Sequence, residues 1–308
     1  MAAVSLRIIC GPTAAGKSAI ALELAERYGG ALVSADSRQI YKGFDIGTAK
    51  PTPPDRARVP HYGIDVIEPA ERYSAVRWAS DAEEWLQRAR DRSQEPILVG
   101  GTGLYIKALV APLFTAPQLD TGRRSSLAEE LDSRPLADLR RWCRVLDPAR
   151  AHLGRTQLIR AIETALLSGK RVSDLHAAQR KEASDAGPRH KPSYLVVDPG
   201  AGLATRIEAR VDAMLESGWQ AEVEALSRTV PADAPAWKAS GYSVMRELAA
   251  GDLELSTARQ RVIIETRQYA KRQRTWLRHQ LPADSVTHVN PDDPALRSTV
   301  REWWEKAE

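Results

Sequence analysis

Short apolar runs alternate with amphipathic stretches in the N-terminal part of the chain. The run at 6–10 (Leu-Arg-Ile-Ile-Cys) is followed by a glycine-rich turn and by an amphipathic pattern at 17–28. Further apolar runs occupy 31–34 and 96–100, and the second of these precedes more glycines and a helical pattern through Leu109. Short apolar runs bounded by turn residues are typical of buried strands. A strand, a glycine turn and a helix in succession predict an α/β fold with a parallel sheet and flanking helices.

Residues 117–189 show a different pattern. Their apolar positions recur at the spacing of an amphipathic helix, and no strand-like run interrupts them. The clearest of these positions are Leu127, Leu131, Leu136 and Leu139. The sequence therefore predicts helices without strands in this region.

The C-terminal part of the chain returns to the first pattern. A strand-like run at 194–197 is followed by a helical pattern from 203 to about 281. A chain of 308 residues is long for a single compact core, which favours a division into two parts. The predicted parts are a catalytic core of residues 1–113 and 197–308, and a helical insertion domain of residues 114–196.

Composition leaves the chain among ordinary soluble globular proteins, at 43% hydrophobic and 27% charged residues. No apolar run approaches the ~20 residues of a membrane span, and the first residues do not form a signal peptide, so we expect no membrane partner. Cys10 and Cys143 are too far apart for a metal-ligand pattern, which indicates a cytoplasmic location and no zinc. A net charge of +4 allows a polyanionic partner without requiring one.

The turn after the first predicted strand carries a phosphate-binding motif. The pattern G-x-x-x-x-G-K-[ST] is matched by Gly11, Pro12, Thr13, Ala14, Ala15, Gly16, Lys17 and Ser18. The motif requires a strand before it and a helix after it, and a chance match would lack both. The N–H groups of the turn and the helix N-terminus attract an anion, Lys17 adds a charge, and the Ser18 hydroxyl can bind Mg²⁺. This motif predicts a P-loop core of the kind that binds nucleoside triphosphates.

Further motifs narrow this class. They are Ser-Ala-Asp-Ser-Arg-Gln-Ile-Tyr at 34–41, Asp-Ile-Gly-Thr-Ala-Lys-Pro at 45–51, His-Tyr at 61–62, Gly-Gly-Thr-Gly-Leu-Tyr at 100–105, Gly-Tyr at 241–242, and Arg-Gln-Tyr-Ala-Lys-Arg-Gln-Arg-Thr-Trp at 267–276. With the P-loop and in this order, they resemble the tRNA dimethylallyltransferase family (isopentenyl-pyrophosphate:tRNA transferases). The likeness covers 11–276, which is nearly the whole chain.

The resemblance implies a reaction and its partners. The family transfers a dimethylallyl group from dimethylallyl pyrophosphate to the exocyclic N6 amine of the adenosine 3′ of the anticodon in tRNA. The leaving pyrophosphate must be neutralised, the weakly nucleophilic amine must lose a proton, and water must be kept from the allylic centre. The implied partners are the anticodon stem-loop of tRNA and the prenyl donor, with Mg²⁺ as cofactor, and we expect a monomer.

Asp36 and Thr102 each follow a predicted strand, and the carboxyl ends of parallel strands share one edge of a sheet. By resemblance, Asp36 is the general base for the adenine amine and Thr102 orients that amine. From the residues alone, Asp36 could instead cap a helix or bind Mg²⁺ through water, and Thr102 could be a helix N-cap. The adenine must leave the stack of the anticodon loop to reach Asp36.

Arg206 and Arg210 lie four residues apart on the polar side of a predicted helix. The apolar side of that helix comprises Ile207, Val211, Met214 and Leu215. Arginines on a polar face are ordinarily solvated. The resemblance nevertheless points to Arg210 as a pyrophosphate ligand, and its planar guanidinium suits two phosphate oxygens.

A helical stripe of basic residues is a candidate RNA-binding surface. Its members are Arg267, Lys271, Arg274 and Arg278. The opposite face holds Val262, Tyr269, Gln273 and Trp276. A solvated helix face would show the same spacing, but the resemblance and a single acid, Glu265, between 259 and 278 favour contact with phosphates.

The resemblance implies further RNA contacts. These residues are Asp36, Ser37, Arg38, Gln39, Thr102, Arg124, Gln157, Arg160, Lys238, Gly241 and Tyr242, beside Lys271 and Arg274 of the stripe. The chain departs from the family at Thr156 and Gln157, where Gln-Arg is common. It departs again at Ser240, where an aliphatic residue is usual, and at Ser243, where a basic residue is common. These departures affect individual contacts and not the reaction.

Two other kinds of protein share parts of this pattern. A P-loop small-molecule enzyme, either a nucleotide kinase or a prenyltransferase acting on free adenine nucleotides, would need neither the insertion nor the basic stripe. An RNA-binding module without chemistry would not need Asp36, Lys17, Ser18 or Thr102.

Overall fold

The computed structural model describes residues 3–111, 117, 119–178 and 189–306. The chain forms two compact units, Ala111–Pro188 and the remainder, which combines Met1–Val110 with Arg189–Glu308. The predicted boundary at 196 and 197 is therefore wrong by eight residues. The reason is β5 (His190–Val197), which pairs with β1 along its whole length and belongs to the larger unit.

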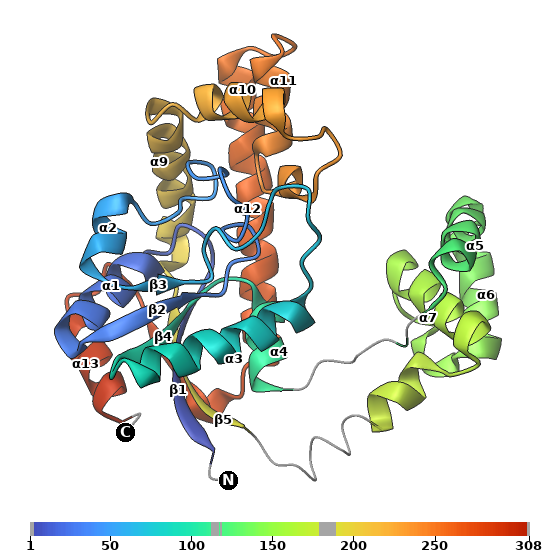
Figure 1. The fold of residues 1–308 in the computed structure, drawn as a ribbon, viewed down its shortest axis with the longest axis horizontal. Coiled ribbons are helices and arrows are strands. Elements are labelled where there is room, and N and C mark those ends of the chain that lie inside the picture. Colours follow the sequence, from blue (N-terminus) through green and yellow to red (C-terminus); the bar gives the residue numbers. More distant parts are fainter. Residues whose placement is uncertain (1–2, 112–116, 118, 179–188, 307–308) are drawn as a thin grey trace. The chain divides into compact units, whose positions relative to one another are not determined.

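One parallel sheet forms the centre of the larger unit (Figure 1). Its strands within the described residues are β1 (Val4–Cys10), β2 (Gly30–Ser34), β3 (His61–Tyr62), β4 (Glu95–Gly100), β5 and β6 (Val286–Val289), in the order β3-β2-β4-β1-β5-β6. All neighbouring strands of the sheet pair in parallel within the described residues. The predicted α/β fold with a parallel sheet is confirmed.

Alternate residues of the strands pack into two separate cores, because successive side chains of a strand point to opposite faces. Ile9, on one face, packs with residues of α1 (Lys17–Tyr28) and α13 (Leu296–Lys306). Ile8, on the other face, packs with Trp78 of α3 (Ala75–Asp91) and with Ile106 of α4 (Gly103–Val110). Both cores exclude water from the sheet, so the strands are fixed in register.

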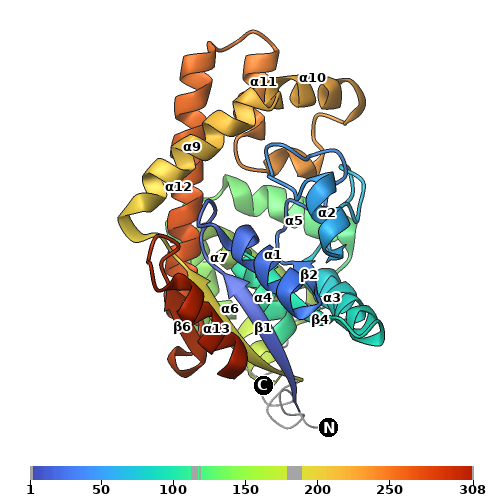
Figure 2. The same ribbon diagram turned by 90° about the vertical axis from the view of Figure 1, so that its left-hand side faces the viewer.

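A group of helices extends from this unit beyond the sheet (Figure 2). It comprises α9 (Leu203–Glu216), α10 (Trp219–Thr229), α11 (Tyr242–Ala249) and α12 (Leu255–Gln280). The short helix α2 (Pro53–Arg58) is not part of this group and lies between β2 and β3. The 26-residue helix α12 contacts both α9 and α11. The predicted helical pattern from 203 to about 281 is confirmed.

The second unit is helical throughout its described residues. Its helices are α5 (Thr121–Ser133), α6 (Leu136–Leu146) and α7 (Arg155–Ser168), and residues 172–178 are also helical. A small separate core holds them together, built from Leu131, Leu139, Cys143, Leu158, Ala161, Ile162 and Val172. The prediction of helices without strands is confirmed for the part of this region that the structure describes.

Candidate active site

The P-loop connects β1 to α1 at the carboxyl edge of the sheet. Gly11 follows β1 directly, and a Cβ atom there would lie 2.1 Å from the carbonyl oxygen of Val197, so only glycine fits. Ala14 and Gly16 have positive φ angles of 61° and 92°, which curl the backbone. No side chain caps the N-terminus of α1, so its first N–H groups can bind an anion.

Two cations meet beside this loop. Burial and the nearby Arg210 guanidinium of α9 together lower the pKa of the Lys17 ammonium to about 8, against the opposing effect of the negative charge of Asp36. Burial also lowers the pKa of Arg210. Lys17 Nζ donates to the carbonyl oxygen of Pro12 at 2.7 Å. Since burial disfavours the charge on both groups, a polyphosphate bound beside them would stabilise both charged forms.

Two cavities share this region. One, of about 700 Å³, is lined by the P-loop with Ser18, Arg206 and Gln273. The other, of about 630 Å³, extends toward Lys238. Thr13, Asp36 and Arg210 line both cavities. Asp36 therefore lies where a ligand on the P-loop and a second ligand in the adjoining cavity would meet.

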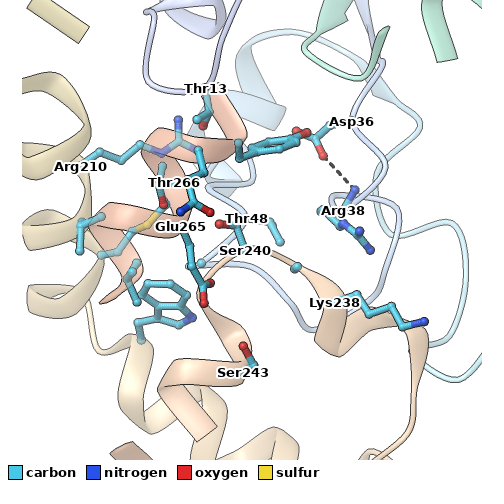
Figure 3. A pocket seen from close by; sticks show the side chains of 18 of the residues that line it. Thr13, Asp36, Arg38, Thr48, Arg210, Lys238, Ser240, Ser243, Glu265 and Thr266 are labelled. Carbon is cyan, nitrogen blue, oxygen red and sulfur yellow. Dashed lines mark hydrogen bonds between the residues drawn. The ribbon is translucent and has the colours of Figure 1, made fainter. Parts of the chain in front are cut away.

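Asp36 and Thr102 come together as the sequence analysis predicted. Asp36 Oδ1 accepts from the Arg38 N–H at 2.8 Å (Figure 3). Thr102 Oγ1 accepts from the Ser37 N–H at 3.1 Å, and its N–H donates to the carbonyl oxygen of Ala35. The chain from Ala35 to Arg38 is thus tied to the loop after β4. These contacts hold Asp36 at the edge shared by β2 and β4.

The Tyr269 side chain of α12 lies near this pair, close enough to Asp36 and Thr102 for both residues to affect its pKa. Burial and the nearby negative charge of Asp36 together raise the pKa of the Tyr269 hydroxyl to about 12. Tyr269 therefore stays neutral at physiological pH and keeps its proton for hydrogen bonding.

The cavity beside Asp36 is lined by both apolar and polar side chains. Its apolar members are Val211, Met214, Trp219, Trp237 and Val262. Figure 3 shows Thr48, Ser240 and Glu265 between Arg210 and Lys238. The sequence analysis did not identify Glu265, Trp219 or Trp237 as site residues, because no local motif marks them. Their role depends on a cavity formed by segments far apart in the chain.

Three of the predicted RNA-binding residues have structural roles. Tyr242 is fully buried, and its hydroxyl donates to Glu222 Oε1 at 2.6 Å. Gly241 is buried, with a φ angle of 84°, and a Cβ atom there would lie 2.5 Å from the Trp219 ring. The amide of Gln39 donates to the carbonyl oxygens of two residues in its own loop. The Tyr242 hydroxyl and the Gln39 amide thus have partners inside the protein, although Gln39 also lines the P-loop cavity, and the RNA contacts of both residues stay predictions.

Other predicted residues of the core lie where a ligand can reach them. Lys238 is exposed and lines the cavity beside Asp36, which Arg38 also lines. Arg272, which was not predicted as an RNA contact, lines the same cavity. The basic stripe of α12 is partly neutralised, because Arg267 pairs with Glu208 and Arg274 pairs with Asp198. Lys271 and Arg278 of the stripe are exposed.

The predicted RNA-binding residues of the second unit also differ in whether their side chains are exposed or already have a partner. Arg124 pairs with the buried carboxylate of Glu163 at 3.3 Å, while more than half of the Arg124 side chain stays exposed. Gln157 Oε1 accepts from the Gly154 N–H at 3.3 Å and so caps α7. Arg160 is exposed on the same helix.

The fold and this site define a P-loop α/β enzyme in which a second cavity meets the phosphate cradle at a carboxylate. A family model described as IPP transferase matches residues 39–280, and one described as isopentenyl transferase matches residues 4–59. The chain belongs to the IPP transferase family.

Named relatives and solved structures resemble this chain over most of its length. The chain is 44% identical to a tRNA dimethylallyltransferase of Halorhodospira halophila over 280 residues, which cover 88% of this chain and 89% of that one. It is 39% identical to the enzyme of the same name from a Cyanothece strain, over 94% of both chains. A tRNA delta(2)-isopentenylpyrophosphate transferase structure from Staphylococcus epidermidis superimposes with a TM-score of 0.68 and 29% identity, over 98% of both chains.

A eukaryotic dimethylallyltransferase structure, described as acting on tRNA, shares the fold with a TM-score of 0.81. It is 23% identical and covers 98% of this chain and 78% of its own. Among the helices of the described residues, none combines the length and apolar character that crossing a membrane would require.

Proposed function

We propose that this chain transfers a dimethylallyl group from dimethylallyl pyrophosphate to the N6 amine of the adenosine 3′ of the anticodon in tRNA. Family membership supports a tRNA dimethylallyltransferase, and one observation carries the assignment of the site. Asp36 lines both the P-loop cavity and the cavity beside it. A carboxylate at this junction can take a proton from an amine that attacks a donor held on the P-loop.

The residues divide the reaction among themselves. The P-loop N–H groups, Lys17 and Arg210 hold the pyrophosphate and neutralise it as it leaves. The N6 nitrogen forms a bond to the allylic carbon, and the carbon–oxygen bond breaks with its electron pair going to pyrophosphate. Asp36 accepts the amine proton, and Thr102 orients the amine. The adenine reaches them only after it leaves the anticodon-loop stack.

The proposed cofactor is Mg²⁺. Ser18 is exposed in the first turn of α1 and lines the P-loop cavity, where a hydroxyl can bind the metal beside phosphate oxygens. No group of three His, Cys, Asp or Glu residues within the described segments could hold a metal alone. This donor set fits a hard cation that keeps most of its waters, and such a cation would add positive charge near the leaving pyrophosphate.

The proposed RNA surface of the core combines exposed cations with those that line the cavity. Its residues are Arg38, Lys238, Lys271 and Arg278. Arg124 and Arg160 of the second unit belong to the same proposal. We further propose a cytoplasmic monomer. Both cysteines are buried free thiols, which supports the reducing compartment of this proposal.

A transfer assay tests the function. The protein is incubated with a labelled C5 donor and either tRNA, the same tRNA with guanosine in place of the adenosine 3′ of the anticodon, or adenosine monophosphate. Label is expected only in the tRNA that keeps the adenosine 3′ of the anticodon. Label in the guanosine-substituted tRNA would contradict the target position, and label in adenosine monophosphate would indicate a free-nucleotide prenyltransferase.

A further inference from the structure

The inner face of α12 contacts two glycine-containing loops at the sheet edge. Tyr269, Gln273 and Trp276 are spaced four and three residues apart, so they share one helix face. Tyr269 lies close enough to Thr102 for this residue to affect its pKa, and a Cβ atom on Gly103 would lie 2.2 Å from the Trp276 ring. The middle residue, Gln273, is the one that reaches both loops.

Gln273 forms a bridge between the P-loop and the loop after β4. Its Oε1 accepts from the Thr13 N–H at 2.8 Å, and its Nε2 donates to the carbonyl oxygen of Gly101 at 2.9 Å. The side chain is 6% exposed. The side-chain amide offers an acceptor and a donor from one planar group, and the reverse orientation of the amide would satisfy neither partner.

The two ends of this bridge belong to the two halves of the site. Thr13 lies in the anion cradle, whereas Gly101 directly precedes Thr102, which binds the Ser37 N–H beside Asp36. A Cβ atom on Gly101 would lie 2.2 Å from Gln273 Nε2, so the loop is in close contact with the amide. The position of the Gln273 amide therefore links the cradle to the base.

We propose that Gln273 is a positioning residue that sets the distance between the P-loop, with its bound donor, and the Asp36–Thr102 pair. This inference rests on the proposed function. Gln273 needs no contact with either substrate, because both of its hydrogen bonds go to backbone groups of this chain. Loss of the bridge affects the alignment of bound reactants and not their affinity.

The test uses Gln273→Met, which keeps the length of the side chain and removes both hydrogen bonds. The single-turnover rate with tRNA and donor prebound is expected to fall about 10- to 100-fold, the usual cost of misplacing reacting groups by roughly 1 Å. The dissociation constants for inorganic pyrophosphate and for tRNA are expected to stay within about threefold of wild type. A residue that only supports the fold would not separate rate from affinity in this way.

Gln280→Met is the matched control, because it makes the same substitution on the same helix. The exposed Gln280 accepts from Lys107 Nζ, which belongs to α4 and to neither of the two loops. Its single-turnover rate should equal that of wild type. Thermal melts establish that each variant is folded at the assay temperature.

Gln273→Asn provides a second variant in case the Met variant does not fold. Its amide is one methylene shorter and can keep one of the two hydrogen bonds, so its rate should lie between those of Gln273→Met and wild type. A folded Met variant with a rate within about threefold of wild type would overturn the inference. If only the Asn variant folds, an Asn rate equal to that of wild type would overturn it, and for either variant so would a rate loss matched by an equal loss of pyrophosphate affinity. Absence of transfer by the wild-type protein would instead contradict the proposed function.

Discussion

The P-loop and the basic stripe on the outer face of α12 both have sequence patterns that predict anion binding, but in the structure part of the basic stripe is already paired with acids. In the P-loop, backbone N–H groups and Lys17 surround one cavity as the motif predicts. On α12, Arg267 and Arg274 pair with acids from the preceding segments of the core, while Lys271 remains exposed. A cradle of backbone groups is determined locally, whereas a charged side chain can be neutralised by any acid that folding brings near it.

This difference separates two kinds of energetic effect. Groups at the cradle act in a partly buried site where charges interact strongly, so changes there should affect the reaction itself. Groups on the outer face act through water and salt, so changes there should affect the binding of RNA in a salt-dependent way.

Asp36→Asn tests the strongest effect expected at the cradle. Asparagine keeps the size of the side chain and an oxygen for the Arg38 N–H, but it cannot accept a proton. Turnover is expected to fall by about 10² to 10⁴, the usual range for a lost general base, while pyrophosphate and tRNA bind nearly normally. Single-turnover rates and both dissociation constants give the measurement.

A Mg²⁺ series distinguishes this role from metal binding by Asp36. If Asp36 held Mg²⁺ through water, the Asn variant would bind donor weakly and excess Mg²⁺ would restore its rate. Full restoration would remove Asp36 from the base role.

The pKa of Lys17 gives a second test at the cradle. The ammonium has a pKa of about 8 in the free protein, and a bound pyrophosphate favours its charged form. Above pH 8, binding must therefore take up a proton, and the affinity for pyrophosphate should fall by up to about tenfold for each pH unit. Below pH 8, the ammonium is already charged and contributes no pH dependence.

Lys17→Arg is the matched control, because arginine stays charged throughout this range. The ratio of wild-type to Lys17→Arg affinity, measured by calorimetry from pH 7 to pH 10, cancels the ionisation of pyrophosphate itself. A ratio that does not change with pH would show that Lys17 is not the titrating group.

The outer face of α12 should respond through salt dependence. Lys271→Gln removes an exposed charge, and the slope of log affinity for tRNA against log salt should decrease in magnitude by roughly 0.7 to 0.9. Arg274→Gln should change the slope less, since the Arg274 guanidinium is bound to Asp198 and to the carbonyl oxygen of Gly200. Equal changes for both variants would mean that RNA displaces Asp198 from Arg274.

Tyr242→Phe should have the smallest effect, and it should fall on stability alone. The substitution removes the hydrogen bond from the buried hydroxyl to Glu222, which is expected to lower the free energy of unfolding by about 1 to 2 kcal/mol. The salt slope of tRNA binding should stay that of wild type. A smaller salt slope than that of wild type would mean that Tyr242 takes part in tRNA binding, although it is buried in this structure.

The sequence alone determined the elements whose signals are local. The apolar run and glycine turn predicted β1 and the start of α1 at Lys17, because strand, turn and helix N-terminus are contiguous in the chain. The order of the motifs identified the family, and the spacing of Tyr269, Gln273 and Trp276 correctly placed them together on one face of α12. The site residues whose positions follow from strand ends, Asp36 and Thr102, were also predicted to come together.

The tertiary structure decided which side chains are available. Tyr242 and Gln39 belong to a matched motif, yet their polar groups are used inside the protein, and the sequence did not mark Glu265 as part of a cavity. The strand β6 and the helix α13 were not predicted either, because they gain their stability from β5 and from the core beside α1. The bridge by Gln273 joins residues 172 and 260 positions away in the chain, and hydrogen bonds of that range exist only once the sheet and α12 have packed together.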